Sequence, residues 1–265
     1  MRALALGTLI VLGMPAMAQD SPVRLYAAGS LRAAMTEIGA AFTKDTGVAV
    51  SGEFGASGLL RDRLAKGEAA DVFASANMEH PQSLAQSGRA RPVVLFARNR
   101  LCALVAPSVG ASSESLLERM LDARVKLGTS TPKADPSGDY AWQVFEKAER
   151  LKAGAYAVLS GKALKLTGGP DAPPLPKDRN VYGKLVAERA ADIFLTYCTN
   201  AIHARKEEPA LEVVALPQAL AVGADYGLTV LDRGGPAASR FALFVMSVRG
   251  QEILARHGFS APALP

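Results

Sequence analysis

The stretch LYAAGSLRAAM, residues 25–35, passes from an apolar run to a helical pattern through only Gly29 and Ser30. Apolar residues then recur at helical spacing from Leu31 to Phe42, which predicts a helix beginning directly after the turn. A helix N-terminus carries unpaired backbone N–H groups and the positive end of a dipole, and glycine lets a ligand approach them. The simpler interpretation is that Ser30 is a helix N-cap and nothing more.

The same order of strand, small residues and helix recurs three times further along the chain. FGASGLLRD places Ser57 before a second predicted helix, DPSGDYAW places Ser137 before a third, and RNVYGKLV places Val181 at the start of a fourth. In α/β sheets, ligands bind at the carboxyl ends of strands, where helices begin. The sequence therefore predicts a pocket rich in N–H and O–H donors, with few acceptors and no obligatory cation, which favours an anion.

Strand-like and helix-like segments alternate through both halves of the chain. The expected strands cover residues 23–27, 71–75, 101–105, 125–128, 193–197, 211–215 and 228–231, and another starts at 48–50. This alternation predicts an α/β protein with mainly parallel sheets and helices on both faces. Residues 161–180 contain Gly168-Gly169-Pro170 and a proline-rich run, so we expect a loop there.

The chain start predicts an exported protein. Of the 265 residues, Met1-Arg2 is positive, an apolar run follows, and a small-residue site ends at Ala18. This pattern indicates a signal peptide over residues 1–18, cleaved near Ala18, and a mature protein in a bacterial periplasm. The net charge of +5 is spread among acidic residues rather than gathered in a basic stripe, so nucleic acid is not an expected partner.

Cys102 and Cys198 are the two cysteines of the chain. Both lie in apolar strand-like segments, so we expect two buried thiols. Because the periplasm is oxidising, one disulfide is the alternative.

Other chemistry-bearing residues do not form a recognisable catalytic or metal-binding pattern. The three histidines are far apart in the sequence and lack the spacing of metal ligands, so no metal site is expected. Asp135 and Asp139 are expected to be solvated carboxylates. No G-x-S-x-G nucleophile elbow is present, so a hydrolase is disfavoured.

Several motifs together resemble the periplasmic molybdate-binding proteins of ABC transporters. They are LYAAGSL, FGASGLLRDRLAKGEAADVFASA, DPSGDYA, YCTNAI and RGQEILARHGF, and they extend over nearly the whole mature chain. The resemblance implies a type II periplasmic binding protein with two α/β lobes and a ligand cleft between them. Lobe 1 would comprise residues 21–106 and 222–265, and lobe 2 residues 107–221. Residues 101–105 and 228–231 would be the hinge strands.

The resemblance also implies five oxyanion-binding residues. Ser30 and Ser57 would donate through their hydroxyls, Ser137 and Val181 through their backbone N–H groups, and Tyr197 through its phenol. Three positions depart from the family pattern: this chain has Gly29 where Ala is usual, Cys198 where Gly is usual, and Asn200 where Asp is usual. The proline-rich stretch from Gly168 to Pro176 has no close counterpart in the family.

The implied function is that of an extracytoplasmic receptor rather than an enzyme. It would capture molybdate or tungstate as a monomer and deliver the ion to the membrane permease of an ABC transporter. Molybdenum would be bound only as its oxyanion, with no direct metal ligand and no cofactor. Alternative functions are a receptor of the same fold for sulfate or another small anion, and an exported enzyme that uses this fold.

Overall fold

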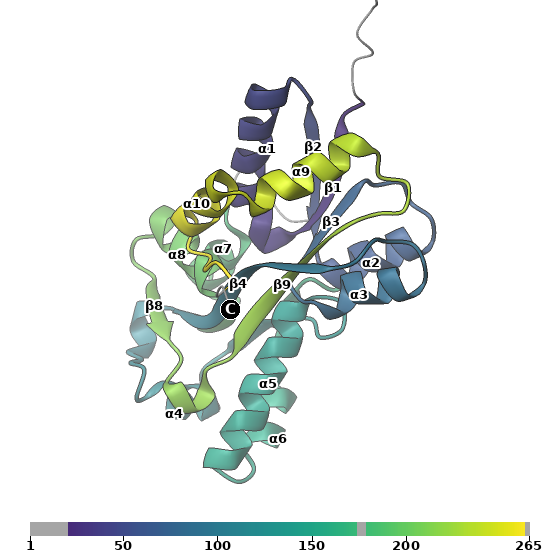
Figure 1. Cartoon of the computed structure of the whole chain (residues 1–265). Helices are drawn as coiled ribbons and strands as arrows, with labels where there is room; N and C mark the ends of the chain where they lie inside the picture. The colour runs from purple at the N-terminus through teal and green to yellow at the C-terminus, as the bar shows by residue number, and fades with distance from the viewer. Residues whose placement is uncertain (1–20, 174–178, 263–265) are drawn as a thin grey trace, which may run out of the picture.

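The computed structural model describes residues 21–173 and 179–262 (Figure 1). The strands in these ranges form one nine-stranded sheet in the order β2-β1-β3-β9-β4-β7-β5-β6, and β8 pairs with β4 beside this path. Their bounds are β1 (Val23–Ala28), β2 (Val50–Gly55), β3 (Val72–Ser75), β4 (Val94–Val105), β5 (Leu127–Ser130), β6 (Leu164–Thr167), β7 (Ile193–Tyr197), β8 (Glu212–Ala215) and β9 (Gly223–Val230).

Helices flank this sheet along its whole width. They are α1 (Arg32–Thr46), α2 (Ser57–Ala65), α3 (Glu79–Gln86), α4 (Leu116–Leu121), α5 (Pro136–Leu151), α6 (Ala155–Lys162), α7 (Val181–Ala187), α8 (Cys198–Glu207), α9 (Pro236–Met246) and α10 (Val248–Arg256). Within the two described ranges, no helix is long and apolar enough to cross a membrane. The expected signal peptide lies outside those ranges.

Helix α1 follows the sequence pattern closely. Its buried residues recur at helical spacing along one face: Ala34, Met35, Ile38, Gly39 and Phe42. The helix ends at Gly47, whose φ of 74° lies in the left-handed region that favours glycine. The Phe42 ring packs edge-on against Phe241 of α9 with ring centres 5.3 Å apart, so α1 and α9 pack together beside β1.

The long strand β4 joins two groups of parallel strands. In one group β1 pairs in parallel with β2 and β3, and in the other β5 pairs in parallel with β6 and β7. Residues 94–100 of β4 pair antiparallel with β9, and residues 101–105 pair antiparallel with β7 and β8. The chain therefore crosses between the groups along β4 and β9, which lie side by side in Figure 1.

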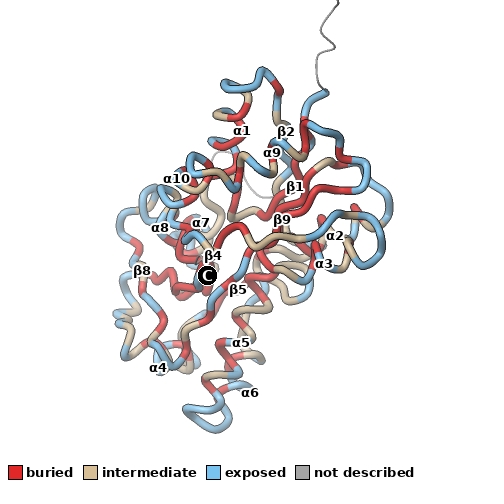
Figure 2. Tube along the Cα trace, in the orientation of Figure 1, coloured by how far each residue is buried: buried red, intermediate tan, exposed pale blue. Residues whose placement is uncertain are grey.

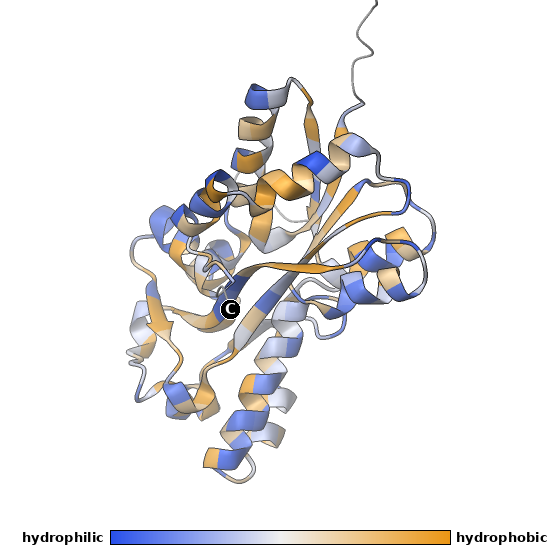
Figure 3. Ribbon diagram, viewed as in Figure 1, coloured by the Kyte–Doolittle hydropathy of each residue, from blue (hydrophilic) through white to orange (hydrophobic). Residues whose placement is uncertain are grey.

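The strands also carry most of the core. All residues of β3, β5 and β7 are buried, as expected for strands covered on both faces. Figure 2 shows the buried segments concentrated in the centre of the molecule and the exposed ones on the outer helices. In Figure 3 the central strands are largely hydrophobic, whereas helices such as α5 alternate between hydrophobic and hydrophilic residues.

The loop predicted over residues 161–180 contains regular structure, so that expectation is wrong in part. Strand β6 pairs in parallel with β5 at the edge of the sheet. Leu164 and Lys165 are exposed and only Thr167 is buried, so the strand lacks the buried pattern that a sequence reading requires. Residues 174–178 of the predicted loop lie outside the described ranges.

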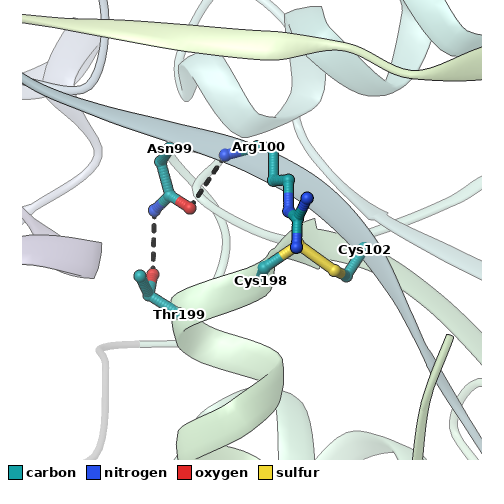
Figure 4. Close-up of a disulfide and its surroundings, with 5 residues drawn as sticks. All are labelled: Asn99, Arg100, Cys102, Cys198 and Thr199. Atoms are coloured by element: carbon teal, nitrogen blue, oxygen red, sulfur yellow. Dashed lines mark hydrogen bonds between the residues drawn. A yellow bond between two sulfur atoms is a disulfide. The ribbon is translucent and has the colours of Figure 1, made fainter. Parts of the chain in front are cut away.

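Cys102 and Cys198 form a disulfide, so the expectation of two free thiols is wrong (Figure 4). Strand β4 pairs with β7 so that Cys102 lies opposite Thr196 and Leu101 lies opposite Tyr197. Cys198, the first residue of α8, therefore begins its helix directly beside β4, with the two Cα atoms 4.8 Å apart. The pairing follows from strand register, which the sequence alone does not show.

Candidate functional site

Ser30 lies in a tight 3-10 turn, Gly29–Leu31, between the end of β1 and the start of α1. Neither this turn nor α1 receives a side-chain cap, so the interpretation of Ser30 as an N-cap is wrong. The hydroxyl instead lies 2.9 Å from the phenol oxygen of Tyr226 on β9. The turn therefore presents the hydroxyl away from its own helix, toward residues that come from the far end of the chain.

Ser57 begins α2 and is almost completely buried. Its Oγ accepts a hydrogen bond from the backbone N–H of Ala76, 3.1 Å away, at the end of β3. The hydroxyl hydrogen is then available to another acceptor. The N–H of Gly58 donates to the carbonyl of Ala134 at 2.9 Å, which holds the start of α2 against the segment that leads into α5.

Ser137, in the first turn of α5, is fully buried and its Oγ has no hydrogen-bond partner in the described residues. Its backbone N–H, the group expected to donate to an anion, donates to the carboxylate of Asp135 at 3.1 Å. Asp135 is the N-cap of α5. The expectation that Asp135 is a solvated carboxylate is wrong, because its side chain is turned to cap α5 and burial raises the pKa of its carboxyl.

Tyr197 ends β7 and immediately precedes α8. Its phenol oxygen is buried and is without a hydrogen-bond partner among the described residues. Its ring lies edge-on to Tyr140 and Tyr226, with ring centres 6.3 Å and 5.6 Å away. Burial raises the pKa of the Tyr197 phenol well above its usual value, so the group stays protonated. A buried hydroxyl with no partner is a donor available to a ligand.

Val181 is the first residue of α7, as predicted, and it follows the N-cap Asn180. The side-chain oxygen of Asn180 accepts from the backbone N–H groups of Tyr182 and Gly183, at 3.0 Å each. The amino end of α7 is thus partly satisfied by its own cap.

A cavity of about 520 Å³ lies where the two groups of parallel strands end. Residues at or just after the carboxyl ends of β1, β2, β3, β6 and β7 line it, as does the segment between β5 and α5, which agrees with the position expected for a ligand in such folds. Its lining residues include Ser30, Ala56, Ala76, Asp135, Gly168 and Tyr197.

The structure brings only some of the five predicted residues to this cavity. Ser30 and Tyr197 line it, whereas Ser57 and Ser137 are not among its lining residues. Ser57 follows the lining residue Ala56, and the N–H of Ser137 donates to the lining residue Asp135. Val181 lines a neighbouring cavity of about 260 Å³, which Ser30 also lines. Ser30 therefore belongs to the walls of both cavities.

Charged residues line the larger cavity as well, and the sequence reading missed them. The guanidinium of Arg32 lies over the Phe54 ring, 4.9 Å from its centre, and burial lowers the pKa of Arg32. Arg63 forms ion pairs with Glu53 and Glu68. Arg32 follows Ser30 by two residues, so its position in the opening stretch was an available signal.

His203 and His257 are stacked, with ring centres 5.6 Å apart, although the sequence separates them widely. His257 lies 2.8 Å from the carboxylate of Glu37, and both histidines line the smaller cavity. In the described part of the chain, no group of three or more His, Cys, Asp or Glu side chains is arranged to hold a metal ion.

The model of the bacterial extracellular solute-binding proteins matches residues 23–260, which is nearly all of the described chain. The chain belongs to this family. Membership indicates an exported protein that binds a solute, and it confirms the sequence prediction at that level. It also favours a binding protein over an enzyme.

Two relatives illustrate the range of similarity to this solute-binding protein. An uncharacterized protein of Pasteurella multocida, PM1146, is 38% identical over 207 residues, covering 78% of this chain and 86% of that protein. The molybdate-binding protein ModA of Mycobacterium tuberculosis is 27% identical over 273 residues, covering 96% of this chain and 95% of ModA.

Solved structures confirm the two-lobe fold. The periplasmic molybdate-binding protein of Azotobacter vinelandii superposes with a TM-score of 0.74 at 18% identity, covering 91% of this chain and 100% of that one. The sulfate-binding protein SubI of Mycobacterium tuberculosis gives 0.76 at 17% identity, covering 91% and 87%. PEB3 with bound L-phospholactate gives 0.69 at 16% identity, covering 91% and 100%. At these identities the likeness establishes the fold alone.

Proposed function

We propose that this solute-binding protein is the periplasmic receptor for a tetrahedral oxyanion, molybdate or tungstate, and delivers the ion to the permease of an ABC transporter. The observation that carries the proposal is the phenol of Tyr197. It is buried, it has no partner in the described structure, and Tyr197 lines the same cavity as Ser30 at the strand ends. The low-identity match to ModA proteins along almost the whole chain supports molybdate as the ion.

The donors around the cavity suit a fully deprotonated anion. Ser30 and Tyr197 offer hydroxyls. The hydroxyl of Ser57, which accepts from the Ala76 N–H, keeps a hydrogen that it can donate. Neutral donors of this kind stabilise an anion without an ion pair. Molybdate is fully deprotonated at neutral pH and requires only donors, whereas hydrogen phosphate also requires an acceptor.

A receptor for sulfate or another small anion is the second candidate, and Asp135 favours an anion that keeps a proton at neutral pH, such as hydrogen phosphate, rather than sulfate. This carboxylate lines the cavity and can accept a hydrogen bond, so a ligand that carries an O–H group would find a partner there. The lobe boundaries that we propose are 106/107 and 221/222, and with these boundaries the residues that line the cavity come from both lobes.

A thermal-shift panel with molybdate, tungstate, sulfate and phosphate tests the proposal. A ligand that binds only the folded state stabilises it by about 2.7 kcal/mol at a concentration of about 100 times its Kd. We expect molybdate and tungstate to raise the melting temperature most. A larger shift of the melting temperature with sulfate or phosphate would identify that anion as the ligand instead. No shift with any of the four anions would argue against an oxyanion receptor.

A further inference from the structure

Asp135 is a carboxylate in the wall of a cavity that otherwise offers donors to an anion. It lies at the amino end of α5, and one of its oxygens, Oδ1, accepts from the N–H of Ser137 at 3.1 Å. The other oxygen, Oδ2, lies close to Gly168: a Cβ added to that glycine would be 2.6 Å from Oδ2. Asp135, Gly168, Ser30 and Tyr197 all line this one cavity. An anion bound there therefore shares the cavity with the Asp135 carboxyl.

The groups packed around Asp135 do not neutralise its charge. Ser130 of β5 and Thr167 of β6 are neutral hydroxyls, 2.8 Å from each other. Tyr182 of α7 and Tyr197 of β7 are neutral phenols whose pKa values are raised by burial, and Asp139 of α5 is acidic.

In the described structure, the cationic groups that line the cavity from the other half form no ion pair with Asp135. Arg63 pairs with Glu53 and Glu68, and Arg32 stacks on Phe54. Burial raises the pKa of the Asp135 carboxyl to about 6, although hydrogen bonds from Ser137 and Ser130 act in the opposite direction. Near neutral pH the empty protein therefore carries a negative charge there that burial disfavours.

From this arrangement, and resting on the proposed function, we infer that the protein takes up one proton at Asp135 when it binds a fully deprotonated oxyanion. The negative charges of the anion and of the Asp135 carboxylate repel each other in one cavity, and this repulsion raises the free energy of the complex. The carboxylate is the group that can accept a proton and so remove the repulsion. The proton comes from solvent and adds to Oδ2, because Oδ1 is held by Ser137. The resulting O–H donates to an oxygen of the anion, so a repelling group becomes an additional donor.

Proton uptake has a defined signature in binding. Below about pH 6 Asp135 is already protonated and affinity is flat with pH, whereas above it affinity falls about tenfold for each pH unit. The affinity continues to fall until the pH exceeds the pKa that Asp135 has when the anion is bound. Calorimetry with sodium molybdate in two buffers of different ionisation enthalpy counts the protons directly, and we expect about one proton per ion near pH 7.5.

Two single variants separate Asp135 from its surroundings. Asp135→Asn keeps a side-chain oxygen that can cap α5, so the helix end stays satisfied, but the side chain cannot ionise. We expect this variant to bind molybdate without proton uptake, with no pH slope, and up to about a hundredfold more tightly than the unaltered protein near pH 8. Asp139→Asn is the matched control, because its carboxylate accepts from the Lys133 N–H and does not line the cavity. It should keep the proton uptake and the slope.

The outcomes distinguish this inference from the proposed function. Molybdate binding by the unaltered protein without proton uptake overturns the inference and leaves the function intact. Sulfate binding with one proton taken up, and no molybdate binding, overturns molybdate as the ligand and leaves the inference intact. If hydrogen phosphate binds most tightly, and its binding neither releases nor takes up a proton, the hydrogen between Asp135 and the ligand comes from the ligand. Asp135 then remains an acceptor, and the inference is overturned. No binding of any of these anions overturns both.

Discussion

Ser30 and Ser137 offer a direct comparison at the scale of single residues. Ser30 lines both cavities and its hydroxyl lies beside that of Tyr226. The hydroxyl of Ser137 is buried, has no hydrogen-bond partner among the described residues, and does not line the larger cavity. A hydrogen bond to a charged group is worth roughly 1.5–3 kcal/mol, and each 1.4 kcal/mol is about tenfold in affinity. We therefore expect Ser30→Ala to weaken molybdate binding by about ten- to a hundredfold, as measured by titration calorimetry.

Ser137→Ala is the control for that measurement. Alanine keeps the backbone N–H and removes only an unpartnered hydroxyl, so affinity should change little. Both variants are first checked for folding by circular dichroism. If Ser137→Ala abolishes binding while Ser30→Ala does not, the site lies elsewhere.

Tyr197 allows binding and stability to be measured on one side chain. Because its phenol oxygen is buried and has no hydrogen-bond partner in the described part of the chain, Tyr197→Phe removes a group that contributes no hydrogen bond there in the empty protein. We expect the melting temperature of the empty protein to stay the same or rise slightly, and molybdate affinity to fall by about tenfold or more. Thermal unfolding with and without molybdate measures both. Lower stability with unchanged affinity would instead make Tyr197 an ordinary core residue.

At the scale of the elements, the turn after β6 holds the cavity wall in place. Gly168 has a φ of 72°, and a Cβ there would lie 2.5 Å from the Cβ of Asp135. Gly168→Ala should destabilise the fold by about 1–2 kcal/mol from backbone strain, and it should also displace Asp135 and change anion affinity. Denaturant unfolding and calorimetry measure the two effects.

Gly47 provides the matched control for this element. Its φ is 74°, but nothing lies within 4 Å of an added Cβ. Gly47→Ala should therefore show the backbone strain alone and bind the anion normally. Equal anion affinities for the two variants would mean that the turn after β6 does not position the site.

At the scale of the whole molecule, two groups of parallel strands are connected through β4 and β9. In this arrangement a ligand in the cavity contacts residues from both groups and favours their approach, because it binds the closed form more tightly. We expect solution X-ray scattering to give a smaller radius of gyration with saturating molybdate than without it. An unchanged radius in the presence of demonstrated binding would show that the lobes do not close on the ion.

Much of the fold could be predicted from local patterns. The apolar spacing of α1, its stop at Gly47, and the small-residue turns at Ser30, Ser57 and Ser137 depend on neighbours along the chain. Such features are encoded within a few residues, because helix caps and turns are short-range structures. Strand β6 was not predicted, because an exposed edge strand lacks the apolar residues by which a buried strand is recognised in a sequence.

The sequence alone predicted the α/β class, the order of the strands other than β6, the family motifs and a cavity at the strand ends. Which side chains meet in that cavity depends on the three-dimensional packing. Ser30 and Tyr226 are 196 residues apart, and the disulfide joins residues separated by 96. The role that we propose for Asp135, uptake of a proton, depends on the cavity around its carboxyl and not on its neighbours in the sequence. These contacts depend on strand register and on how the two groups of strands face each other, and both are set by long-range packing.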